Sequence, residues 1–180
     1  MGGSVRKTEV IILHHGKGWK DCPFDAETWV TNQGFKRSNR VDRLFLMHKQ
    51  VYADGRQLFD WHDINRQSVE KKFEVISLHD ISELNSNLYP YKKIVKKFST
   101  DYFTSSTTYM IAFAMYYGYT KIRLYGMNFF YGISDEKEDF NERCGVEYWI
   151  GRCHQANIEV DIHKGNLMTT ATGKPYAING

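Results

Sequence analysis

Residues 102–130 have the sequence YFTSSTTYMIAFAMYYGYTKIRLYGMNFF. Five hydroxyl residues, 104–108, come early in this segment. Serine and threonine favour helix starts because their oxygens accept hydrogen bonds from the free N–H groups of the first turn. The run 110–116 is apolar on nearly every face, as in a helix enclosed in a core. Gly118 can end that helix, and 121–125 predict a strand, so the segment is half of an α/β unit.

The hydroxyl run has two interpretations. Capping of a core helix is common for serine and threonine, and it explains the pattern without a ligand. Alternatively, the free N–H groups at the helix start bind the phosphate of a nucleotide. On the second interpretation, Thr104, Ser105 and Ser106 are candidate nucleotide-binding residues.

The totals indicate an ordinary globular protein. The chain has 180 residues, which suits a single domain over 1–180, with 42% apolar and 25% charged residues. We expect residues 1–6 to be disordered or to come from an expression tag, and 163–180 to form an irregular tail. No apolar run approaches the ~20 residues of a membrane span, and no signal peptide is evident, so the expected location is cytoplasmic.

Charge and cysteine content argue against several classes of protein. The net charge of +3 is small and dispersed, whereas a nucleic-acid interface is usually more basic and more clustered. The three cysteines have no CxxC spacing, so neither a zinc site nor a disulfide framework is predicted, and we expect no metal-binding residues among them. The sequence leaves open whether the protein forms a homo-oligomer.

Apolar segments rich in β-branched and aromatic residues predict six strands, at 10–13, 28–31, 41–48, 73–78, 121–125 and 158–162. Beyond the helix that follows the hydroxyl run, helices are predicted within 50–72, 91–98 and 147–156. Loops are predicted at 84–90 and at the acidic run 135–139. The alternation predicts an α/β fold: a single Rossmann-like three-layer domain around a mostly parallel central sheet of about six strands.

The first predicted strand leads directly into the turn HHGKGW, residues 14–19. Open α/β folds place ligands at such turns. Gly16 and Gly18 would let the backbone approach a phosphate, and Lys17 would add positive charge. The turn matches neither GxGxxG nor GxxxxGK[ST], so a plain loop is equally consistent with it.

Polar residues also follow other predicted strands. Asn32 follows the second, where its amide could hydrogen-bond a base or a ribose, and turn formation is the alternative. His15 and His48 are acid–base candidates because histidine titrates near neutrality, and a structural role is the alternative for each. Carboxyl ends of parallel strands share one edge, so we expect these residues to gather there with His79 and 104–108.

Two motifs carry a resemblance to known families: TSS at 104–106 and GYTKIRLYGMN at 118–128. The chain resembles Rossmann-like proteins grouped with archaeal 6-hydroxymethyl-dihydropterin pyrophosphokinases and flagellar motility accessory factors, a group that includes many small phage proteins. It also resembles bacterial sialyltransferases that use CMP-sialic acid. In both groups a T-S-G/S motif precedes an alanine-rich helix and a G-Y/F-K-x-I-x-L-x-G-x-D strand. The resemblance covers about 10–50 and 100–165.

The sialyltransferase resemblance implies nucleotide-binding roles for the turn 15–16, for Asn32 and for 104–105. The chain departs from the pattern at Asn128, where the family has aspartate, and at Phe130, where it has tyrosine. Asn128 stays a candidate nucleotide-binding residue by position.

A further departure concerns the general base. The sialyltransferases use a downstream histidine for this role, whereas this chain has no histidine between His79 and His154.

Three functions follow as hypotheses. The favoured one is a glycosyltransferase-like group transfer from a nucleotide-activated donor, with a nucleotide or nucleotide sugar as partner. The second is pyrophosphokinase-like phosphoryl transfer, in which Lys17 contacts phosphates and carboxylates of 135–139 help to hold Mg²⁺, the only cofactor implied. The third is a non-catalytic nucleotide binder. Any of the three could be phage-encoded.

Overall fold

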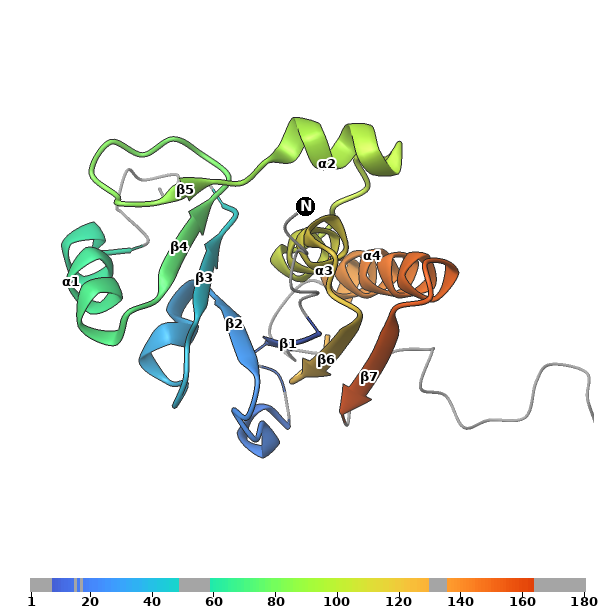
Figure 1. The fold of residues 1–180 in the computed structure, drawn as a ribbon, viewed down its shortest axis with the longest axis horizontal. Helices are drawn as coiled ribbons and strands as arrows, with labels where there is room; N and C mark the ends of the chain where they lie inside the picture. The colour runs from blue at the N-terminus through green and yellow to red at the C-terminus, as the bar shows by residue number, and fades with distance from the viewer. Residues whose placement is uncertain (1–7, 15, 17, 49–58, 130–135, 164–180) are drawn as a thin grey trace, which may run out of the picture.

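The computed structural model describes residues 8–14, 16, 18–48, 59–129 and 136–163, with only the backbone of 136–139 (Figure 1). Seven strands form one all-parallel sheet in the order β5-β4-β3-β2-β1-β6-β7. The strands are β1 (Glu9–Leu13), β2 (Glu27–Thr31), β3 (Arg43–Leu46), β4 (Glu74–Ser77), β5 (Asn87–Leu88), β6 (Lys121–Tyr125) and β7 (Glu159–His163).

Four α-helices flank this sheet: α1 (Trp61–Lys71), α2 (Tyr91–Phe98), α3 (Ser106–Tyr117) and α4 (Glu136–Gln155). Two short 3₁₀ helices, η1 (Trp19–Asp21) and η2 (Asn32–Lys36), follow β1 and β2. The α/β prediction is confirmed.

Two local predictions were wrong. The segment 84–90, which was expected to be a loop, contains β5, a strand that was not predicted. β5 has only two residues, both exposed, so no run of apolar residues marks it in the sequence. The acidic run was expected to be a loop, but 136–139 form the first turn of α4, which begins eleven residues before the expected 147. Residue 135 and residues 50–58 of the predicted helical region 50–72 lie outside the described residues.

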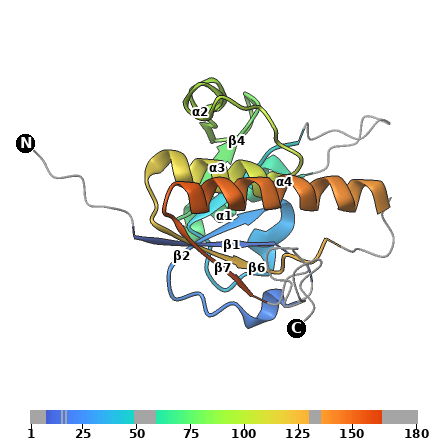
Figure 2. The same ribbon diagram turned by 90° about the vertical axis from the view of Figure 1, so that its right-hand side faces the viewer.

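The sheet separates two apolar cores because successive side chains of a strand point to opposite faces. On one face, Val10, Ile12, Trp29 and Phe45 pack with residues of α3 and α4. On the other, strand residues such as Ile11 pack with residues of α1. Figure 2 shows α3 and α4 side by side above the sheet.

Helix α3 lies at the centre of the first core. It has no charged residue, and nine of its twelve residues are buried, so it is enclosed on nearly all sides. It ends at Gly118, whose left-handed backbone (φ 81°) lets its N–H bond the carbonyls of Ala114 and Met115. Because α3 runs antiparallel to β6, its N-terminus lies at the carboxyl-terminal edge of the sheet.

The order of the strands reverses next to β1. From β1 the chain adds β2, β3, β4 and β5 on one side, and it then crosses over through α2 and α3 to place β6 on the other side. Leu13 is level with Val30 of β2 and with Tyr125 of β6, so the ends of these three strands coincide. In open α/β sheets, the crevice at such a reversal is where ligands bind.

Candidate functional site

Backbone hydrogen bonds join two glycine turns, one after β1 at Gly16 and one after β6 at Gly126, and they form the floor of the candidate site at this edge. His14 N–H donates to the Tyr125 carbonyl (2.9 Å), and Gly16 N–H donates to the Gly126 carbonyl (3.1 Å). A Cβ on Gly16 would lie 2.3 Å from that carbonyl oxygen, so only glycine fits there. Gly16 was expected to bring the backbone close to a phosphate. Its N–H is taken up by the turn after β6, and the phosphate contact stays a prediction. Gly18 immediately precedes η1, and His15 and Lys17 lie outside the described residues.

Asn32 follows β2 and has two unusual features. Its backbone is left-handed (φ 50°), which asparagine tolerates better than most residues. Its side-chain Oδ1 is fully buried and has no hydrogen-bond partner among the described residues. A buried carbonyl-type oxygen without a partner typically costs about 1–3 kcal/mol, so this position requires an explanation.

The start of α3 contains a second oxygen of this kind. Ser105 N–H donates to Thr108 Oγ1 (3.3 Å), and that hydroxyl donates to the Ser105 carbonyl (2.6 Å). Ser105 and Thr108 therefore form a capping box, in which the buried Ser105 Oγ faces the Thr108 N–H. Among the residues that the structure describes, however, Ser105 Oγ makes no hydrogen bond of normal geometry. The capping interpretation of the hydroxyl run is thus confirmed for Ser105 and Thr108, and the nucleotide-binding interpretation stays a prediction.

Two neighbouring hydroxyls have structural contacts. Ser106 Oγ lies 3.4 Å from His48 Nε2, which joins the start of α3 to the end of β3. Thr104 Oγ1 donates to the Glu142 carbonyl (3.5 Å). A Cβ on Gly145 would lie 1.9 Å from Thr104 Oγ1, so Thr104 packs directly against α4. His48 is exposed, consistent with access to solvent.

Asn128 follows β6 on the same edge. Its N–H donates to the Gly126 carbonyl (2.8 Å), and the residue is half-buried. The structure therefore brings Gly16, Asn32, His48, Ser105 and Asn128 to one edge, each at the end of a strand or at the start of α3.

A histidine–aspartate pair at this edge was missed by the sequence reasoning. His163 ends β7, and its Nε2 lies 3.2 Å from Asp21 Oδ2 in η1. Its ring stacks on Tyr125 at 4.9 Å, and burial raises the pKa of the Tyr125 hydroxyl. The position of His163 at the end of the last predicted strand was the available signal, but Asp21 is 142 positions away in the sequence.

The described residues contain no group of three His, Cys, Asp or Glu side chains that could hold a metal ion. The carboxylates invoked for Mg²⁺, within 135–139, belong to side chains that the structure does not describe. No helix in the described ranges is both long enough and apolar enough to cross a membrane.

No protein-family model and no curated protein sequence matches the chain. Solved structures do. The sialyltransferase CstII from Campylobacter jejuni with CMP-3FNeuAc has a TM-score of 0.58 and 16% identity, over 90% of this chain and 82% of that one. CST-II in complex with trisaccharide acceptor and CMP also has a TM-score of 0.58 and 16% identity, over 90% and 83%.

An α-2,3-sialyltransferase from Campylobacter jejuni in apo form matches with a TM-score of 0.56 and 13% identity, over 92% of this chain and 79% of that one. What these likenesses show is the fold. It is the fold of proteins solved with CMP and a CMP-sugar analogue, in agreement with one of the two resemblances found in the sequence. The three structures are sialyltransferases, and they lend no support to a pyrophosphokinase or to a phage origin.

Proposed function

We propose that the carboxyl-terminal edge of the sheet binds a nucleotide-activated donor and that the protein is a glycosyltransferase-like group-transfer enzyme. The observation that carries this proposal is that two buried oxygens, Asn32 Oδ1 and Ser105 Oγ, make no hydrogen bond of normal geometry to any described residue. Both lie at the edge where the strand order reverses, one after β2 and one at the start of α3. A ligand with N–H and O–H donors would satisfy them.

A nucleotide has the matching groups. Its base has N–H donors and its ribose has hydroxyls, which an amide oxygen and a serine hydroxyl can accept from. The N-terminus of α3 adds free N–H groups and a positive dipole end for a phosphate. The fold likeness to CMP-binding sialyltransferases supports the same class of ligand.

Of the two acid–base candidates, His15 and His48, only His48 is among the residues that the structure describes. It is exposed and lies beside Ser106, so it could exchange a proton with an acceptor hydroxyl at the mouth of the site. His48→Gln should lower the turnover rate while leaving nucleotide affinity within about twofold, since the proposed role is in the chemical step. Equal loss of affinity and turnover would contradict that role.

Thermal shift measurements test the binding step. The ligands are CMP, CMP-sialic acid, UDP-sugars and ATP with and without Mg²⁺. A ligand at about 100 times its Kd should add about 2.7 kcal/mol to the free energy of unfolding. No shift with any of them would refute the proposal. A shift only with ATP and Mg²⁺ would favour phosphoryl transfer, and binding of a nucleotide sugar without turnover would indicate a non-catalytic binder.

Ser38→Ala is a matched control for Ser105→Ala. Ser38 Oγ is also buried and without a partner among the described residues, but it lies after η2, where the chain returns towards the start of β3. Ser38→Ala should melt as the wild type does without ligand or slightly higher, since it removes no hydrogen bond from the described residues. Ser105→Ala removes the N-cap hydroxyl of α3 and should lower the free energy of unfolding by about 1 kcal/mol. Only Ser105→Ala should bind the nucleotide more weakly, by about fivefold or more. Equal binding by both variants would place the ligand elsewhere.

A further inference from the structure

A cavity of about 340 Å³ lies away from the candidate nucleotide site, on the α3 face of the sheet. It is open beside the starts of β3 and β4, which lie at the amino-terminal edge, and beside the edge strand β5. Its polar lining is Arg43, Glu74 and Asn87, and its apolar lining includes Leu88, Phe113 and Tyr117. A volume of this size lies in the range of small-ligand sites.

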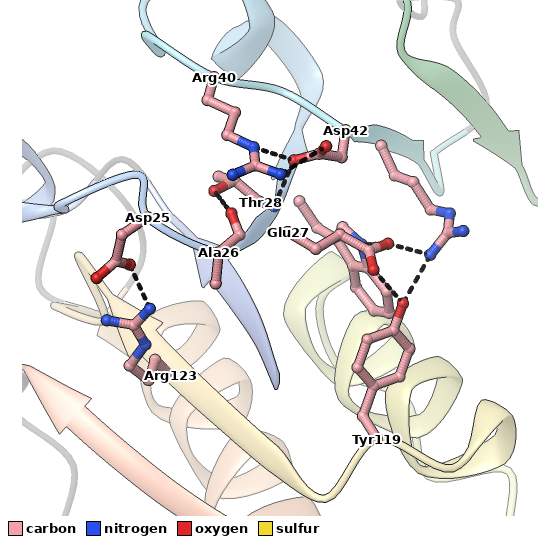
Figure 3. Close-up of polar contacts among 10 residues, drawn as sticks. Asp25, Ala26, Glu27, Thr28, Arg40, Asp42, Tyr119 and Arg123 are labelled. Carbon is pink, nitrogen blue, oxygen red and sulfur yellow. Dashed lines mark hydrogen bonds and ion pairs between the residues drawn. The ribbon is translucent and has the colours of Figure 1, made fainter. Parts of the chain in front are cut away.

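Arg43 is held in a fixed position by four groups. Its Nε donates to Glu74 Oε2 (2.6 Å), and its Nη1 donates to Glu27 Oε1 (2.5 Å) and to the Tyr119 hydroxyl (3.1 Å). The guanidinium also lies over the Trp29 ring at 5.4 Å. Figure 3 shows the Tyr119 hydroxyl pointing at Glu27, to which it donates at 2.5 Å. The guanidinium is thus oriented before any ligand arrives.

Some hydrogen-bonding capacity is left at the wall of the cavity. Within the described residues, Arg43 Nη2, Glu74 Oε1 and the side-chain amide of Asn87 make no hydrogen bond. Together they offer two N–H donor groups and two oxygen acceptors. Hydroxyl groups, which both donate and accept, match such a mixed set.

The charge of this wall disfavours anions. The guanidinium of Arg43 is shared by two carboxylates, Glu27 and Glu74, so the group of three carries a net charge of −1. A phosphate or a carboxylate would meet that negative charge in a site that is partly screened from water. An anionic ligand is therefore disfavoured, which separates this cavity from a second nucleotide site. The mixed set of donors and acceptors, and not the charge, is what favours hydroxyl groups.

The rest of the lining is apolar and unusually accessible. Tyr117 is 47% exposed and Leu88 is 57% exposed, although both are large apolar residues. The Tyr117 and Phe113 ring centroids are 4.4 Å apart, so the Phe113 ring supports the Tyr117 ring. A supported aromatic face is a suitable surface for the C–H face of a sugar ring, with the hydroxyl edge turned to the polar wall.

We propose that this cavity binds one residue of a neutral saccharide. The polar wall would hydrogen-bond the sugar hydroxyls, and Tyr117 and Leu88 would cover one face of the ring. This inference goes beyond the proposed donor site, because the cavity lies at the amino-terminal edge of the sheet and shares no residue with that site. It would hold a glycan chain away from the reaction.

The test is saturation-transfer NMR on the full chain with lactose, maltose and cellobiose, followed by affinity measurements. We expect saturable binding of at least one of these sugars with a Kd below about 10 mM. Tyr117→Ala should weaken binding about tenfold because it removes the aromatic face. Glu74→Gln should weaken it several-fold because it replaces a carboxylate acceptor by a neutral amide. No saturable binding up to about 50 mM would refute the proposal.

Glu70→Gln is the matched control for Glu74→Gln. Both carboxylates have side chains that are 54% exposed and that pair with an arginine, but Glu70 lies on α1, on the other face of the sheet. Glu70→Gln should leave sugar binding unchanged. Ser105→Ala should also leave it unchanged, and Tyr117→Ala should leave nucleotide binding unchanged. Sugar binding that Ser105→Ala abolishes, or that Tyr117→Ala leaves intact, would overturn the assignment to this cavity.

Discussion

The contact between the two glycine turns can be tested by placing a methyl group inside it. A Cβ on Gly126 would lie 2.0 Å from the His14 carbonyl oxygen, and a Cβ on Gly16 would lie 2.3 Å from the Gly126 carbonyl oxygen. Cβ atoms do not approach other heavy atoms within 3.0 Å, so the backbones must separate by about 1.0 and 0.7 Å respectively. Backbone held in a parallel sheet cannot move that far without disturbing its ladder.

Two other glycines separate the steric effect from the conformational one. Gly118 shares the left-handed backbone of Gly126, with φ values of 81° and 69°, but a Cβ on Gly118 would meet nothing within 4 Å. Gly118→Ala should therefore cost about 1–2 kcal/mol for the backbone alone. Gly126→Ala should cost that amount and about 1–3 kcal/mol more for overpacking.

Gly151 is the corresponding control for Gly16. It lies within α4, and its Cβ would also meet nothing within 4 Å, so Gly151→Ala should stabilise by roughly 0.5–1 kcal/mol. Gly16→Ala should destabilise by about 1–3 kcal/mol through overpacking.

Equilibrium urea unfolding measures all four variants. The informative quantities are the difference between Gly126→Ala and Gly118→Ala and the difference between Gly16→Ala and Gly151→Ala, with unchanged m-values. Each difference should exceed about 1 kcal/mol. If both are below about 0.5 kcal/mol, the two turns do not pack as closely as described, and the floor of the candidate site is wrong.

Three further predictions concern single side chains. Tyr119→Phe removes a hydroxyl that is hydrogen-bonded to Glu27 and Arg43. It should lower the free energy of unfolding, measured in urea, by about 1–3 kcal/mol. A loss below about 0.5 kcal/mol would contradict the hydrogen-bond network. The hydrogen bond from Gln67, with help from Arg66 and Lys36, lowers the pKa of Asp63 from 3.8 to about 2. Its folded pKa is the lower one, so its stabilising effect is present above pH 3.8 and is lost as pH falls towards 2. NMR titration of the carboxyl should show that midpoint, and Asp63→Asn should melt with less pH dependence in this window. Burial raises the pKa of the Cys153 thiol to about 12, so Ellman's reagent at pH 8 should modify it only as fast as the protein unfolds.

The candidate site was predictable in outline. Because parallel strands end at one edge, the positions of Asn32, His48 and the hydroxyl run after predicted strands or before a helix were enough to place them together. Their individual roles were not predictable. Which hydroxyls of the run form the capping box and which contact α4 or His48 depends on rotamers and on the packing of α4 against Thr104, and neither leaves a pattern in the sequence.

The sequence by itself determined the central α/β unit. The apolar run of α3, its terminal Gly118 and the strand after it are local patterns, and β6 was predicted with its observed bounds. The amphipathic helix α2 was likewise predicted at its observed bounds because its apolar residues repeat at helical spacing. Local patterns suffice wherever the interactions that fix an element lie within it.

Only the tertiary structure decided the remaining features. The cluster of Glu27, Arg43, Glu74 and Tyr119 joins residues that are up to 92 positions apart. It exists because the order and register of the strands place the first residues of β2, β3 and β4 side by side. The same holds for the packing of Gly16 on Gly126 and for the pairing of Asp21 with His163. A side chain's partner at such distances follows from how the sheet is assembled, and the sequence around each residue contains no record of that assembly.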